Sequence, residues 1–359
     1  MTTLPILFSA PIALSSGLVE TNVRENTYFA QQNDRHQLQE LLRQGRHKVE
    51  AKEYEAATQV YQQAARLDPE NPRIFSGIGY LEAQQGNYNT AVWAYRRAIE
   101  LDPDNGEFYY ALGHTLAKIQ NYNSATTAFY RATELIPEKA EAYLGLGAVL
   151  LRQNDRAGAL TIYQKLLTIS PNHPQANAMV GSLLVQLGNY PRAIAHLKKV
   201  TQIFPQTASA WLDLTTAYQQ QGQFNFALQT IETFLQRYPR HAGGYYKKGK
   251  LLQATGNIAA AESAYKQAIQ LDAKPVEALV SLGEVQLKQS EYSEAVTTYE
   301  RLTELIPNNP SVYYNLGLAL KGDDRVSEAR QAFQTAYQLF NKVRNQEGKD
   351  RSQMQLRSL

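Results

Sequence analysis

The stretch GEFYYALGHTLAKIQNYNSATTAFYRATELIPEK, residues 106–139, contains the pattern that decides the fold. In its first half, apolar or small residues recur three and four positions apart. Residues with this spacing lie on one side of a helix, which turns by 100° per residue. These residues are Tyr109, Leu112, Gly113 and Leu116. This side of the helix is therefore expected to be buried.

The stretch is one copy of a repeat with a period of 34 residues, and an alanine marks the same place in every copy. The alanines are Ala57, Ala91, Ala125, Ala159, Ala193, Ala227, Ala261, Ala295 and Ala329. When each unit is numbered from 1 to 34 with this alanine at 20, position 8 is Gly in eight units and Thr215 in the sixth. The spacing predicts nine units without insertions, at 38–71, 72–105, 106–139, 140–173, 174–207, 208–241, 242–275, 276–309 and 310–343.

Each unit is expected to form a hairpin of two helices. Turn residues such as Gly86-Asn87 stand at positions 15 and 16 and separate the first helix from a second apolar stripe at positions 17, 20, 24 and 27. Small residues at positions 8 and 20 allow the two backbones to approach closely, and proline, present at position 32 in seven units, ends the second helix. Glycine in a helix costs about 1 kcal/mol relative to alanine, so its recurrence at position 8 indicates that close packing outweighs this loss.

The combined pattern resembles the tetratricopeptide repeat: aromatic at 4, Leu at 7, Gly at 8, Tyr or Leu at 11, Ala at 20, aromatic at 24, Ala at 27 and Pro at 32. The resemblance covers residues 38–343. It implies an all-α fold, a right-handed superhelical α-solenoid of antiparallel helix pairs whose first helices line the concave side and serve as a platform for protein partners. The 35-residue repeats of the pentatricopeptide RNA readers would break this register within a few units.

Residues 1–37 are expected to form an N-terminal extension. Its apolar stretch 4–14 has the character of a signal sequence, but no Lys or Arg precedes Arg24, and Pro5 and Pro11 favour a flexible segment instead. We therefore expect a cytoplasmic protein, with export to the periplasm as the alternative.

Residues 344–359 are predicted to be either a polar tail or a capping helix. Met354 and Leu356 could cover the open face of the last hairpin, whereas Gly348 would interrupt a helix.

Composition and motifs argue against several function classes. The 36 basic and 33 acidic residues give a net charge of +3 spread along the chain, so a nucleic-acid partner is not expected. No apolar run reaches the roughly 18 residues of a membrane span, and the chain has no cysteine for thiolate chemistry. The histidines share no metal-site spacing, and no catalytic arrangement is apparent. We expect no enzyme activity, no cofactor and no metal.

The best candidate for a binding surface is the second face of the first helices, which contains positions 2, 5, 9, 12 and 13. Position 5 carries no charge in any unit. This pattern favours an apolar groove for a partner peptide or helix, with packing between neighbouring first helices as the alternative. The predicted groove residues are Tyr80, Tyr110, His114, Leu144, Ala148, Leu151, Met179, Ser182, Val185, Leu212, Tyr246, Lys247, Lys250 and Tyr314.

Unit 7 departs most from the pattern, since Lys248 occupies the usually apolar position 7 and Ala273 replaces proline at position 32. Lys247 and Lys250 are expected beside Tyr246, where they would form a basic and aromatic patch for an acidic partner segment. The alternative is a flexible joint between units 6 and 7.

Taken together, the sequence predicts a non-catalytic protein-protein interaction scaffold that binds a partner peptide or helix in the concave groove. The alternative is an assembly factor, or chaperone-like adaptor, for a larger complex that could be membrane-bound.

Overall fold

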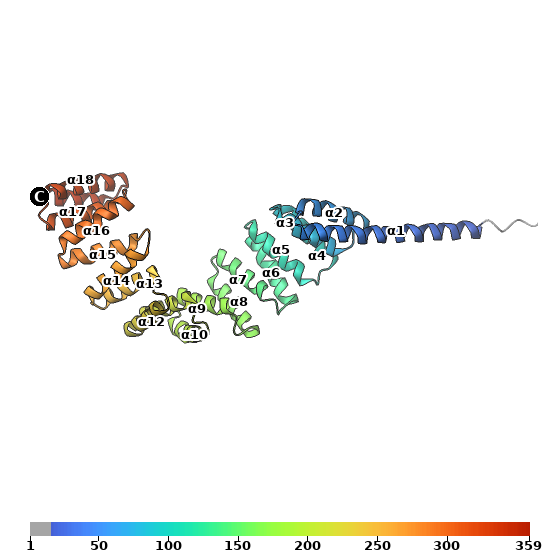
Figure 1. The fold of residues 1–359 in the computed structure, drawn as a ribbon, viewed down its shortest axis with the longest axis horizontal. Helices are drawn as coiled ribbons and strands as arrows, with labels where there is room; N and C mark the ends of the chain where they lie inside the picture. Colours follow the sequence, from blue (N-terminus) through green and yellow to red (C-terminus); the bar gives the residue numbers. More distant parts are fainter. Residues whose placement is uncertain (1–15) are drawn as a thin grey trace, which may run out of the picture. The chain divides into compact units, whose positions relative to one another are not determined.

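The computed structural model describes residues 16–359, and every regular element in this part of the chain is an α-helix (Figure 1). The apolar stretch 4–14 lies outside the described residues. The chain divides into two compact units, Met1–Asn172 and His173–Leu359, here called the N-terminal and C-terminal bodies. Each body is a stack of helix pairs, so the predicted all-α solenoid of antiparallel pairs is confirmed.

The described part of the N-terminal body contains units 1–4. Its helices are α1 (Ser16–Glu50), α2 (Tyr54–Leu67), α3 (Pro72–Gln84), α4 (Tyr88–Leu101), α5 (Gly106–Lys118), α6 (Tyr122–Leu135), α7 (Ala140–Arg152) and α8 (Arg156–Ile169). Helix α1 has 35 residues, because the first helix of unit 1 continues without a break from the preceding segment.

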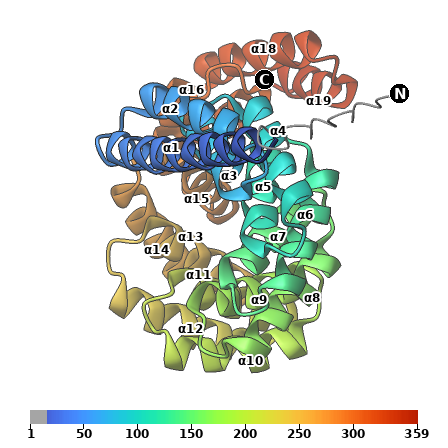
Figure 2. The same cartoon turned by 90° about the vertical axis from the view of Figure 1, so that its right-hand side faces the viewer.

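The C-terminal body contains units 5–9 and one further helix. Its helices are α9 (Pro174–Gln186), α10 (Tyr190–Ile203), α11 (Ala208–Gln220), α12 (Phe224–Arg237), α13 (Ala242–Ala254), α14 (Ile258–Leu271), α15 (Val276–Gln289), α16 (Tyr292–Leu305), α17 (Pro310–Gly322), α18 (Val326–Lys342) and α19 (Gln346–Arg357). Successive helices pack side by side (Figure 2).

The hairpin turn has one conformation in all nine units. Position 15 has a positive φ throughout, between 58° at Asp324 and 83° at Gly86, although only four of these residues are glycine. The amide of position 16 then donates to the carbonyl of position 11, as from Asn87 to Glu82 at 2.9 Å. This pair of features closes the end of the first helix and starts the second in a fixed direction.

The packing inside each hairpin depends on position 8. A Cβ atom added to Gly113 would lie 2.9 Å from the Phe129 ring at position 24 of the same unit, and Gly79 meets the Tyr95 ring at the same distance. The alanine at position 20 is fully buried in all nine units. In unit 6, where Thr215 replaces the glycine, position 24 is Ile231 rather than an aromatic residue.

The junction between units 6 and 7 explains two departures from the pattern. Phe234 stands at position 27, where alanine is common, and is completely buried against Gly244, whose added Cβ would lie 2.8 Å from the Phe234 ring. The ammonium of Lys248 forms an ion pair of 2.8 Å with Glu232 of α12. The large ring and the cation at this junction therefore each have a matching partner across it.

The chain ends in a helix that packs on the last repeat. Helix α18 continues past position 32, which is Asn341 instead of proline, and α19 begins after Arg344 at φ 57°. Gly348 does not interrupt α19, because it is buried against the Phe340 ring. Leu356 contacts the core of unit 9, whereas Met354 is 60% exposed and does not cover it.

We predict that Gly113→Ala lowers the midpoint of denaturant unfolding followed by circular dichroism. Crowding against Phe129 costs about 1–3 kcal/mol, which exceeds the gain in helix propensity of about 1 kcal/mol. Gly243→Ala is the matched control, since its Cβ would meet only the His241 ring, at 3.4 Å, so this variant should raise the midpoint. A higher midpoint for Gly113→Ala would contradict the packing account.

Candidate functional site

A cavity of about 410 Å³ lies between α11 and α13, the first helices of units 6 and 7 in the C-terminal body. Four of the predicted groove residues line it: Leu212, Tyr246, Lys247 and Lys250. The other lining residues are Asp213, Thr216, Gln219, His241 and Gly243. The cavity therefore combines an aromatic ring and an aliphatic side chain with charged groups of both signs.

The Lys247 ammonium is fixed in position on α11. It donates to the Thr216 hydroxyl at 2.8 Å, and that hydroxyl donates to the Leu212 carbonyl at 2.8 Å. Burial lowers the pKa of Lys247, and the negative charge of Asp213 opposes this shift. A lysine ammonium has three donors, so Lys247 can still donate to a ligand.

Asp213 is the carboxylate of this cavity. Burial raises its pKa, while a hydrogen bond from Ser182 and the charge of Lys247 act in the opposite direction. The attraction between Asp213 and Lys247 acts through space, and neither side chain belongs to an ion pair within the described part of the chain. The cavity therefore holds two partly desolvated opposite charges that do not neutralise each other by direct contact.

Tyr246 shows how a side chain at position 5 packs within its hairpin. Its ring packs on Tyr265, at position 24 of the same unit, with 6.0 Å between ring centroids. Tyr110 and Tyr314 pack on their own position 24 rings in the same way, at 6.1 Å and 5.7 Å. The position 5 residue is half-buried in all nine units, so one side packs in the hairpin and the other borders the surface.

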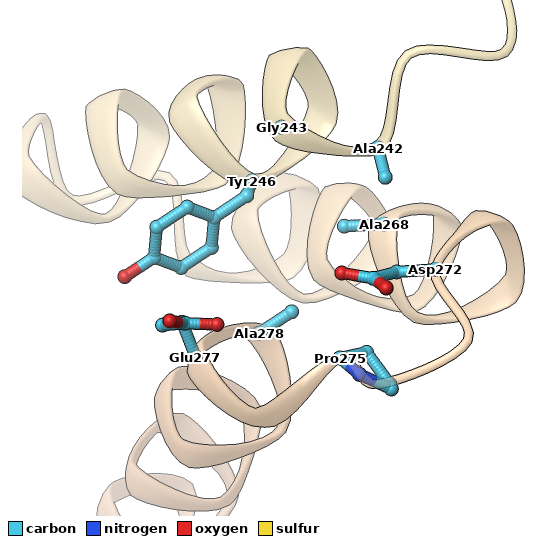
Figure 3. A pocket seen from close by; sticks show the side chains of 8 residues that line it. All are labelled: Ala242, Gly243, Tyr246, Ala268, Asp272, Pro275, Glu277 and Ala278. Atoms are coloured by element: carbon cyan, nitrogen blue, oxygen red, sulfur yellow. The ribbon is translucent and has the colours of Figure 1, made fainter. Parts of the chain in front are cut away.

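A second cavity, of about 280 Å³, lies on the other side of Tyr246, between α13 and α15 (Figure 3). The Asp272 and Glu277 carboxylates face the same space as the Tyr246 ring. The other lining residues are Ala242, Gly243, Ala268, Pro275 and Ala278. Asp272 follows the end of α14, and its carboxylate accepts a hydrogen bond of 2.9 Å from the Lys274 amide.

The remaining predicted residues do not share this site. Leu144, Ala148 and Leu151 lie in the N-terminal body together with Tyr80, Tyr110 and His114. Met179, Ser182, Val185 and Tyr314 lie in the C-terminal body, and only Ser182 reaches the cavity network, through Asp213. The predicted central part of the groove, in units 4 and 5, thus falls on two different bodies.

Two of the predicted tyrosines are covered by cations of their own chain. The Lys139 ammonium lies 4.7 Å from the centre of the Tyr110 ring and also pairs with Glu107 at 2.9 Å. The Arg351 guanidinium of α19 lies 5.3 Å from the centre of the Tyr314 ring. Tyr246 has no such cover among the described residues and is the most available of the three rings.

The sequence analysis missed Asp213, Thr216, Asp272 and Glu277. Asp213 and Thr216 occupy positions 6 and 9 of unit 6, the same positions as Lys247 and Lys250 in unit 7. Comparing equal positions of neighbouring units would have found the first pair. Asp272 and Glu277 lie close in sequence to Ala273, which replaces the proline of position 32. This replacement was a signal of altered structure there.

The described residues contain no helix that is long and apolar enough to cross a membrane. They also contain no group of three or more His, Cys, Asp or Glu side chains that could hold a metal ion.

Known proteins similar to this chain are repeat proteins. A TPR repeat-containing protein of Picosynechococcus sp. (strain PCC 7002) is 33% identical over 78 residues, which are 22% of this chain and 20% of that protein. A tetratricopeptide repeat protein from Parabacteroides merdae has 18% identity and a TM-score of 0.50, covering 69% of this chain and 98% of that one. YrrB, described as a TPR protein with an unusual peptide-binding site, has 22% identity and a TM-score of 0.45, covering 52% and 97%.

Family models cover most of the chain. Tetratricopeptide repeat models match residues 42–106, 184–250, 246–310 and 280–343. A model described as the TPR domain of cytochrome c-type biogenesis protein H matches residues 94–211. Together these matches extend from residue 42 to residue 343, with the period and the packing positions described above, and the chain belongs to the tetratricopeptide repeat family.

Proposed function

We propose that this chain is a non-catalytic scaffold that binds a segment of a partner protein at the cavity between α11 and α13. The tetratricopeptide fold indicates a role in protein-protein interaction. The observation that carries the proposal is the juxtaposition of the half-buried Lys247 ammonium, the exposed Lys250 and the uncovered Tyr246 ring around one space.

These groups suit a short peptide that contributes an apolar side chain and an acidic group. The Tyr246 ring and Leu212 provide apolar contact, worth about 25 cal/mol per Å² of buried surface before ordering costs are subtracted. The two lysines provide charge-assisted hydrogen bonds to a carboxylate, which are stronger than neutral ones. The fixed position of Lys247 on Thr216 reduces the ordering cost of this contact.

A second candidate function is that of an adaptor in the assembly of a larger complex. It is favoured by the match of residues 94–211 to the TPR domain of a cytochrome c-type biogenesis protein. This match ends at Trp211 within α11, the helix that also supplies Leu212 and Asp213 to the cavity.

The first prediction concerns the location of binding. Random heptapeptides displayed on phage and selected on the intact protein should yield ligands that lose about tenfold in affinity with Lys250→Glu, because an attractive charge becomes repulsive. Fluorescence anisotropy with the resynthesised peptides measures this loss. Leu151→Glu in α7 is the matched control on the predicted groove face and should leave the affinity unchanged.

Circular dichroism of each variant separates a loss of binding from a loss of folding. Lys250 is exposed, so its reversal should leave the helical spectrum intact. Ligands that bind the Lys250→Glu variant as tightly as the parent would refute the cavity as the binding site.

The second prediction concerns pH. An acidic peptide is attracted only by the protonated form of Lys247, and burial lowers the pKa of this ammonium. The affinity should therefore fall as the pH rises, and the fall should begin below the pH at which an ordinary exposed lysine titrates. Lys247→Arg keeps the charge at all these pH values and should flatten the profile. Equal pH profiles for the parent and Lys247→Arg would exclude a contact between Lys247 and the peptide.

A further inference from the structure

The two cavities beside Tyr246 form neighbouring parts of one surface in the C-terminal body. Both are lined by Gly243 and Tyr246 of α13, and they lie on the two sides of this helix, toward α11 and toward α15. Tyr246 therefore stands between them, with its hairpin side packed on Tyr265. A peptide that leaves the first cavity across α13, past Gly243 and Tyr246, enters the second.

The two cavities carry opposite charge. Lys247 and Lys250 line the first, against the single carboxylate of Asp213, which is already engaged by Ser182. Asp272 and Glu277 line the second without a cation among its lining residues, although Lys274 is in the adjoining loop. Lys250, Asp272 and Glu277 form no ion pair within the described part of the chain. The charges of Lys250 and Glu277 are therefore available to a ligand, and Asp272, whose Oδ1 accepts from the Lys274 amide, keeps its second carboxylate oxygen for one.

Gly243 lines both cavities. This exposed residue lies in the first turn of α13, and the nearest atom to an added Cβ would be His241 Cε1, at 3.4 Å. Because Gly243 lines both cavities, a larger side chain at this residue would project where a ligand passes from one cavity to the other.

On these grounds we infer that the partner segment carries an acidic and a basic residue about three positions apart, with the residues between them passing over Tyr246. The two cavities lie on opposite sides of α13. A helix with its side chains is about 10–12 Å across, and an extended peptide advances about 3.3 Å per residue, which gives about three positions. The acidic residue meets Lys247 and Lys250, and the basic residue meets Asp272 and Glu277. The inference rests on the proposed function, since it specifies the ligand of the same site.

The test uses the heptapeptide library on the intact protein and on Glu277→Lys. Peptides selected on the parent should contain an acidic and a basic residue about three positions apart, and those selected on Glu277→Lys should lose the basic residue and keep the acidic one. A parent-selected peptide should bind Glu277→Lys about fivefold more weakly. Glu294→Lys, an exposed reversal in α16, is the matched control and should bind like the parent.

A double-mutant cycle shows whether the basic residue of the peptide meets Glu277. Replacing the basic residue of the peptide by glutamine should weaken its binding to the parent protein by a similar factor. The same replacement should cause little further loss of affinity when the protein already carries Glu277→Lys. Gly243→Leu leaves all charges in place. It should weaken the binding of a peptide that spans both cavities more than the binding of a shortened peptide that keeps only the acidic end.

The outcomes separate the two proposals. If the selected peptides depend on Lys250 but carry only acidic residues, and if Glu277→Lys leaves their affinity unchanged, the inference is overturned and the proposed function stands. The absence of any Lys250-dependent peptide would overturn both.

Discussion

The structure depends on the contact between the side chain at position 24, which is an aromatic ring in seven units, and the bare backbone at position 8. The ring occupies the volume that a side chain at position 8 would need, as Phe129 does over Gly113, and this brings the two helices of a hairpin together. Two units depart from the aromatic contact: unit 5 pairs Gly181 with Leu197, and unit 6 pairs Thr215 with Ile231. The buried Thr215 hydroxyl donates to the Trp211 carbonyl at 2.8 Å, so the exchange leaves no unpaired donor.

This contact is local to one hairpin, which is why the sequence was sufficient to predict so much of the fold. The period and the turn at positions 15 and 16 repeat nine times, and most helices begin and end at the same positions of their units, so each copy supports the interpretation of the others. The last helix lies outside the repeat, so no other copy supports a prediction of its structure. There Gly348 suggested a helix break, but a contact with Phe340, which helix propensity cannot anticipate, buries this glycine inside α19.

The candidate site was only partly predictable, because it is made by contacts between units. The repeat register placed Tyr246, Lys247 and Lys250 on one face of α13, but it did not indicate that Asp213 and Thr216 of α11 would meet them. Nor did it distinguish Tyr246 from Tyr110 and Tyr314, which share its position but lie beneath Lys139 and Arg351. Which position 5 ring is uncovered depends on side chains outside the repeat consensus.

The pairing of Phe234 with Gly244 has a consequence for how such an array can evolve. Position 27 of one unit faces position 3 of the next, and Ala98 with Phe108 achieves the same fit with the large and small residues exchanged. Hairpins that look interchangeable by consensus are therefore matched to their neighbours. Duplicating or shuffling unit 7 would place Gly244 beside an alanine in most positions and leave a void. The order of the repeats is therefore set by matched residues at the junctions between them, and recombination that ignores this match should destabilise the array even when every individual hairpin still folds.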